Sequence, residues 1–188
     1  DSGRSVIHVA ALHQHLDQVP AAGLTEKSLS LQDNEGNTPL HIAAANGCLH
    51  QLPATVIKPQ LFAVPNAQGL TAAATAIING HFHQLPAALQ PDILNAPEAP
   101  LDNTALHVAA AVGCLNRVPA KLMTGENLRR QNKSGQSVFH AAAAYGYLRQ
   151  IPKRLLTAEN LLESDENGFT AVEMAVNQGH IDQLPKVF

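Results

Sequence analysis

The chain has 188 residues, a formal net charge of −3, two cysteines and no tryptophan. Hydrophobic residues make up 45% of it but aromatic residues only 4%, so its core must be thin and built from Ala, Leu, Val and Ile. Charged residues are 14% and form no basic stripe, which argues against nucleic acid as a partner, and no apolar run is long enough to cross a membrane.

Glycine and proline each recur at a step of 33 residues. The glycine ladder is Gly3, Gly36, Gly69, Asp102 in place of glycine, Gly135 and Gly168, and the proline ladder is Pro20, Pro53, Pro86, Pro119, Pro152 and Pro185. Two ladders in one register predict one structural unit repeated six times. We therefore expect a single solenoid over residues 1–188, with repeats at about 1–32, 33–65, 66–98, 99–131, 132–164 and 165–188.

Each unit begins with signals for a short helix. Ser or Thr stands two residues after the ladder position, as an N-cap would, and an Ala-rich apolar stretch of about nine residues then ends at a glycine such as Gly47. Gln14 replaces that glycine in the first unit. A helix this short is not stable alone in water, so neighbouring units must hold it.

A second helical segment follows around the ladder proline. Because proline removes a backbone donor and clashes one turn back, this segment is expected to begin at the proline or to have an irregular first turn. Sequences such as Thr157-Ala-Glu-Asn-Leu161 then predict a third, very short helix, which Pro59 and Pro91 are expected to start in two other units. Polar turns such as 33–36 lead into the next unit.

The segment GNTPLHIAAANG, residues 36–47, resembles the ankyrin repeat. Its T-P-L-H-x-A core is intact at Thr38, Pro39, Leu40, His41 and Ala43, and the 33-residue period matches. The resemblance covers the whole chain and implies an all-α fold of stacked helix-turn-helix units joined by β-turn-like loops. It also implies that the histidine of this motif links adjacent turns by hydrogen bonds.

Some units depart from the family pattern. The third has Ala74 and the sixth has Glu173 at the histidine position, and Leu-x-Gln-Leu-Pro replaces the usual start of the second helix. This variant is similar to ankyrin arrays in bacterial proteins, including effectors of intracellular pathogens. That similarity implies a cytoplasmic protein, in the host cytoplasm if it is a secreted effector. Neither end reads as a polar terminal cap, so we expect these residues to be part of a longer protein.

Chemical sites receive little support from the sequence. Cys48 and Cys114 occupy equivalent positions two units apart, about 20 Å in such a stack, which is too far for a disulfide. Seven of the ten histidines fall at two repeated positions, so the H-x-H pairs at 13–15 and 81–83 do not predict a metal site. No G-x-S-x-G or phosphate-binding G-x-x-x-x-G-K motif occurs. We expect no catalytic residue, no metal and no cofactor in these 188 residues.

Partner binding is the function that the resemblance implies, on the concave face and the turn tips. Apolar residues that the scaffold does not require occur there at Leu70, Ile78, Leu101, Val112, Tyr145 and Phe169. We expect these six to line a groove with Tyr145 near its centre, together with Asn79, Lys133, Gln136 and Asn177. An alternative is that several of the six act as spacers that pack against neighbouring turns.

The sequence thus predicts a monomeric protein–protein interaction module whose partner is a protein or peptide, not a nucleic acid or a membrane. Two alternatives remain open. The repeats would recruit substrate for an enzymatic domain outside these residues, or they would be a spacer with no partner of their own.

Overall fold

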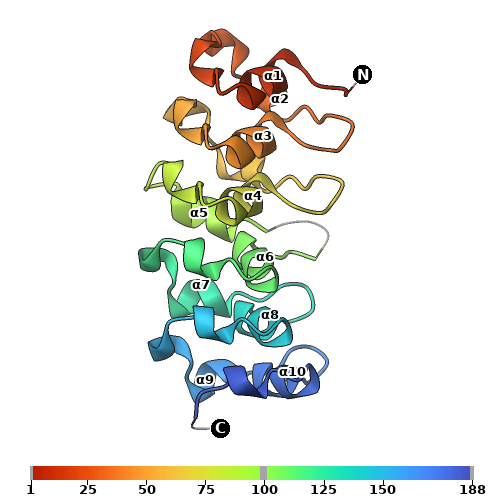
Figure 1. Cartoon of the computed structure of the whole chain (residues 1–188), viewed down its shortest axis with the longest axis vertical. Coiled ribbons are helices and arrows are strands. Elements are labelled where there is room, and N and C mark those ends of the chain that lie inside the picture. The colour runs from red at the N-terminus through yellow and green to blue at the C-terminus, as the bar shows by residue number, and fades with distance from the viewer. Residues whose placement is uncertain (1, 98–100, 187–188) are drawn as a thin grey trace. The chain divides into compact units, whose positions relative to one another are not determined.

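The computed structural model describes residues 2–97 and 101–186. The chain divides into two compact units, residues 1–99 and 100–188, and each holds three of the predicted repeats (Figure 1). The fold class is all-α, as expected, with isolated antiparallel bridges at Pro65–Thr71 and Ser164–Thr170 beside the turns. The expectation of one continuous solenoid over residues 1–188 stays a prediction. No helix in the described ranges is long and apolar enough to cross a membrane.

The first helix of each repeat forms where the caps predict it. In the first unit these helices are α1 (Val6–Leu12), α3 (Pro39–Asn46) and α4 (Ala72–Ile78), and in the second they are α6 (Ala105–Ala111), α8 (Val138–Ala144) and α10 (Ala171–Asn177). All begin after the predicted Ser or Thr N-cap. They are seven or eight residues long, slightly shorter than expected. Within each unit, every one of these helices packs against the next (Figure 1).

The ladder positions are left-handed, which explains why glycine dominates them. Gly36, for example, has a φ of 75°, where a Cβ is unfavourable. Among the described residues, the non-glycine residues with positive φ are Gln14 at 60° and Asp102 at 54°. These are the two places where the sequence substitutes another residue for a repeated glycine, so the backbone keeps its conformation despite the change.

The second segment is broken at the proline into two short 3-10 helices. The first pieces are η1 (Leu16–Gln18), η3 (Leu49–Gln51), η6 (Phe82–Gln84), η7 (Leu115–Arg117), η9 (Leu148–Gln150) and η11 (Ile181–Gln183). In four repeats a second piece starts directly after the proline, as η2 (Ala21–Gly23), η4 (Ala54–Val56), η8 (Ala120–Leu122) and η10 (Lys153–Leu155). The segment therefore restarts at the proline, as one of the two expected forms had it, but it is 3-10 rather than α-helical.

The third helix is present and begins where the sequence indicates. Threonine caps α2 (Glu26–Leu29), α7 (Gly125–Arg129) and α9 (Ala158–Leu161). Pro59 is the first residue of η5 (Pro59–Phe62), and Pro91 lies in the first turn of α5 (Gln90–Asn95).

The core of each unit is built mainly from Ala, Leu and Ile, in line with the composition. Alanines of the first helices are fully buried where successive helices meet, as Ala43 and Ala109 show. The largest fully buried side chains are Phe62 and Phe82 in the first unit and Phe139 in the second. Small residues at the contact allow close packing of neighbouring helices, so each repeat depends on its neighbours for burial.

Candidate functional site

In each unit, buried histidines form hydrogen bonds to the tip of the next turn. The Nε2 atoms of His8, His41, His107 and His140 lie 2.8–3.2 Å from the carbonyl oxygens of Asn37, Leu70, Gln136 and Phe169, each 29 residues further along. Every one of these carbonyls belongs to the residue just after a ladder position. The link between adjacent turns that the resemblance implied is therefore present, and it places the tip residues.

The other ring nitrogen of each histidine caps the helix. The backbone N–H of Thr38 donates to Nδ1 of His41 at 3.0 Å, so Nδ1 is an acceptor and Nε2 carries the proton given to Leu70. Only a neutral imidazole satisfies both bonds. Burial lowers the pKa of His41 and that of His107 below the usual value of 6.5, which favours this neutral form.

A second set of hydrogen bonds, from turn N–H groups to an Asp or Asn side chain, also holds the turn tips. The Asp33 carboxylate accepts from the backbone N–H groups of Glu35 at 3.0 Å and Asn37 at 2.9 Å. Asp165 does the same for Asn167 and Phe169, and Asn66 and Asn132 supply an amide oxygen in two other turns. Burial acts to raise the pKa of the Asp33 and Asp165 carboxyls, but hydrogen bonds outweigh it and the pKa of each is lowered. The turn N–H groups donate to both carboxylates, and the side chains of Arg4 and Gln136 add a bond to Asp33 and Asp165 respectively. These side-chain hydrogen bonds thus hold the backbone of the turns in one conformation.

The third and sixth repeats, which lack the histidine of the motif, keep the helix cap but lose the hydrogen bond to the next turn. In the third repeat Thr71 Oγ1 accepts from the N–H of Ala74, which has no side chain to reach another turn. In the sixth repeat Glu173 accepts from the N–H of Thr170 at 2.8 Å, and this hydrogen bond lowers the pKa of the glutamate.

In the second unit, four of the predicted apolar residues are exposed. Tyr145 is 58% exposed, Leu101 49%, Phe169 46% and Val112 45%. Val112 and Tyr145 are the C-caps of α6 and α8, which pack side by side, so they hold the same position on successive repeats. Leu101 and Phe169 lie at the tips of the fourth and sixth repeats. Their exposure is compatible with a binding surface, which stays a prediction.

In the first unit the predicted residues are less accessible. Leu70 and Ile78 are half-buried, so the alternative that some of the six act as spacers applies best to them. Asn79 is exposed at the C-cap of α4, but its side-chain amide donates back to the carbonyl of Thr75 at 2.9 Å.

The predicted polar residues differ in their exposure and in the partners of their side chains. Lys133 lies 3.4 Å from the Asp102 carboxylate, with both side chains exposed. Gln136 is half-buried and donates to Asp165 at 3.1 Å, which gives it a structural role between two turns. Asn177 is exposed at the end of α10.

A glutamine that recurs at one position of the repeat joins neighbouring repeats by hydrogen bonds, a role that the sequence alone did not indicate. Gln51 donates to the carbonyl of Gln14 and accepts from the N–H of Leu16, and so joins two repeats. Gln84 accepts from Leu49 N–H in the same way, and Gln150 donates to Gly113 at 2.8 Å. The recurrence of glutamine two residues before the ladder proline was the available signal.

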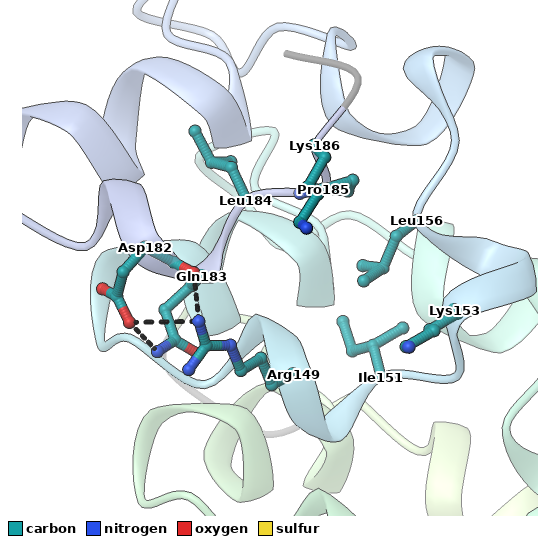
Figure 2. A pocket seen from close by; sticks show the side chains of 9 residues that line it. All are labelled: Arg149, Ile151, Lys153, Leu156, Asp182, Gln183, Leu184, Pro185 and Lys186. Carbon is teal, nitrogen blue, oxygen red and sulfur yellow. Dashed lines mark hydrogen bonds and ion pairs between the residues drawn. The ribbon is translucent and has the colours of Figure 1, made fainter.

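A pocket that the sequence analysis also did not indicate opens in the second unit. It has a volume of about 550 Å³ and lies against η9, η10 and η11 (Figure 2), and none of its lining residues is a predicted site residue.

The two thiols, and a histidine at the same repeat position, make local contacts in the described residues. Cys48 and Cys114 are free, and burial raises the pKa of Cys48, whose Sγ lies 3.4 Å from the carbonyl of Ala11. His81 occupies the equivalent place and bonds Ala44 through Nδ1 at 2.8 Å. No group of three or more metal-ligating side chains converges in residues 2–97 and 101–186.

Comparisons with known proteins agree with this architecture. The family model of the ankyrin repeat matches residues 35–52. No curated protein matches the sequence. Among solved structures, the ankyrin repeat domain of Bcl-3, a member of the IκB family, is similar with a TM-score of 0.60 and 17% identity over 97% of this chain and 99% of that one.

A second similar chain comes from the complex of the predatory endopeptidase Bd0816 of Bdellovibrio bacteriovorus with the immunity protein Bd3460. Its TM-score is 0.56, with 22% identity over 96% of this chain and 97% of that one. At these identities the likeness concerns the fold. Together with the 33-residue period and the histidine links between turns, it shows that this chain has the fold of ankyrin repeats, and residues 35–52 match the repeat itself.

Proposed function

We propose that the chain is a protein-binding module, and that its second unit binds a protein or peptide partner on the surface formed by the turn tips and the C-terminal ends of the first helices. The observation that carries this proposal is Tyr145. It is a large aromatic side chain, 58% exposed, at a helix end whose cap needs only its backbone. Exposed tyrosine on a rigid surface is a frequent energetic centre of protein interfaces.

The surroundings of Tyr145 support the proposal. Val112 repeats its position on the neighbouring helix, and Phe169 and Leu101 add exposed apolar area at the tips. Because histidine and aspartate bonds hold the tips in place, a partner would meet a preformed surface and little ordering entropy would oppose binding. Lys133, with its exposed ammonium group, and Asn177 offer polar contacts at the edge. Leu70, Ile78 and Asn79 of the first unit are left out of this surface, because Leu70 and Ile78 are half-buried and the Asn79 amide bonds to its own helix.

Affinity capture tests this function with a matched pair of variants. One carries Tyr145→Ala and Phe169→Ala. The control carries Leu162→Ala, which removes a side chain of similar exposure, 52%, from the end of α9 in the same unit. Both variants should retain the circular dichroism and melting of the parent.

A partner held by the parent and by the Leu162 control, but lost by the Tyr145/Phe169 variant, would support the proposal. Equal capture by all three chains would refute this surface. Capture of nothing by any of them would favour the second candidate function, a spacer within a larger protein.

A further inference from the structure

The pocket in the second unit is lined by the ends of the fifth and sixth repeats. Its walls come from the segment around η9 and η10 on one side and from η11 and the residues after it on the other (Figure 2). The lining residues are Arg149, Ile151, Lys153, Leu156, Asp182, Gln183, Leu184, Pro185 and Lys186. About 550 Å³ lies within the range of cavities that bind small ligands or the side chains of a peptide.

The inner wall of the pocket is apolar. Ile151 is buried, while Leu156 and Leu184 are half-buried and border the opening. Together these three side chains give the pocket its aliphatic surface.

The glutamine that joins repeats behaves differently here. Gln51 and Gln150 reach back to a carbonyl of the preceding repeat, at Gln14 and Gly113. Gln183, at the same position of the sixth repeat, instead donates to the neighbouring Asp182 carboxylate at 2.8 Å. Its amide lies on the pocket wall beside Arg149 (Figure 2).

The rim of the pocket is cationic. Arg149, Lys153 and Lys186 contribute three positive charges, against one carboxylate, Asp182, which lies 3.4 Å from the Arg149 guanidinium. Within residues 101–186, neither Lys153 nor Lys186 makes an ion pair with a carboxylate. Their ammonium groups point toward the space bordered by Ile151 and Leu156 (Figure 2).

An occupant complementary to this pocket carries negative charge around an apolar side chain. None of the described residues that line the pocket is aromatic, so these nine side chains offer no platform on which a nucleic-acid base would stack. We propose that the pocket binds an acidic peptide segment of a partner protein, with one aliphatic side chain against Ile151, Leu156 and Leu184 and its carboxylates near Lys153 and Lys186. This site is separate from the Tyr145 surface, and neither proposal depends on the other.

The test is a titration of the 188-residue chain into the fluorescein-labelled peptide Glu-Glu-Asp-Leu-Asp-Glu, followed by fluorescence anisotropy at low salt. Saturable binding is expected. The double charge reversal Lys153→Glu with Lys186→Glu should weaken it at least tenfold, because two attractions become repulsions. The matched control is Lys121→Glu, an exposed lysine of η8 outside the pocket lining, which should change affinity less than twofold.

A second measurement tests the contact between the aliphatic side chain of the peptide and the pocket. A peptide with serine in place of the leucine should bind about fivefold more weakly, because partial burial of one aliphatic side chain is lost. Leu184→Ser should reduce affinity for the leucine peptide and leave the serine peptide unaffected.

Three outcomes would overturn the assignment. The first is no saturable binding, or equal affinity of the Lys153/Lys186 variant and the parent. The second is equal binding of the serine peptide together with full competition by a ten-residue oligothymidylate, which would indicate a general polyanion surface. The third is concentration-dependent self-association of the chain that Leu184→Ser abolishes, which would show that a second copy occupies the pocket.

Discussion

Replacing His41 with alanine should destabilise the first unit by removing three interactions at once, two of them buried and one partly buried. The backbone N–H of Thr38 loses its acceptor at 3.0 Å, the hydroxyl of Thr38 loses its partner at 2.8 Å, and the carbonyl of Leu70 loses a donor at 2.9 Å. Thr38 is 0% exposed and His41 only 2%, so water does not readily replace these bonds.

The magnitude follows from which groups remain unpaired. Leu70 still accepts from the N–H of Asn66 at 2.8 Å, so losing the histidine bond there costs about 1 kcal/mol. The orphaned N–H of Thr38 costs about 1–3 kcal/mol because it is buried without an acceptor. The total is therefore about 3 kcal/mol before any loss of ring packing, a large share of the about 5–15 kcal/mol that stabilises a typical domain.

A glutamine variant separates the cap from the link between turns. Glu173 shows that a side-chain oxygen at this position can accept from the N-cap N–H without reaching the next turn. His41→Gln should therefore recover about 1–2 kcal/mol of the loss, since the Thr38 N–H regains an acceptor. Urea unfolding followed by circular dichroism gives the stability, and amide hydrogen exchange of residues 66–70 reports the freed turn. A change below about 0.5 kcal/mol for His41→Ala would refute the reasoning, since it is the scale of an ordinary surface substitution. Equal losses for the two variants would refute the role of the cap.

Two other predictions concern pH and the ladder. Burial lowers the pKa of His41 and His107 in the folded chain below 6.5, so the unfolded chain binds more protons between those values, and stability should be full above pH 6.5 and fall as pH drops below it. Urea midpoints at pH 7.5, 6.5 and 5.5 check this, and a midpoint that rises toward pH 5.5 would contradict it. Gly135→Ala should be more destabilising than Gly168→Ala by about 1 kcal/mol or more, because both have positive φ but only at Gly135 would the Cβ lie 2.7 Å from a backbone nitrogen, that of Glu166. Thermal melting compares the two, and equal melting temperatures would show that the turn yields without cost.

The sequence alone determined those features of the fold that depend on interactions between residues close together in the chain. N-caps such as Thr38 and the left-handed positions are decided within a few residues, so the 33-residue ladder placed the first helices and the short third helices correctly. Even the exceptions obey the local rule, since Gln14 and Asp102 keep positive φ where glycine is missing. The histidine links were also predictable, because the family motif carries them.

Tertiary structure alone decided which polar side chains are committed to the scaffold. Gln51 bonds residues 35 and 37 positions away, and Gln136 bonds a carboxylate 29 positions away, so no local pattern distinguishes them from free surface amides. The pocket near Lys153 depends likewise on side chains of two repeats meeting in space. Backbone conformation follows from neighbours in sequence, whereas exposure, pairing and cavities depend on distances between repeats, and those exist only once the repeats are stacked.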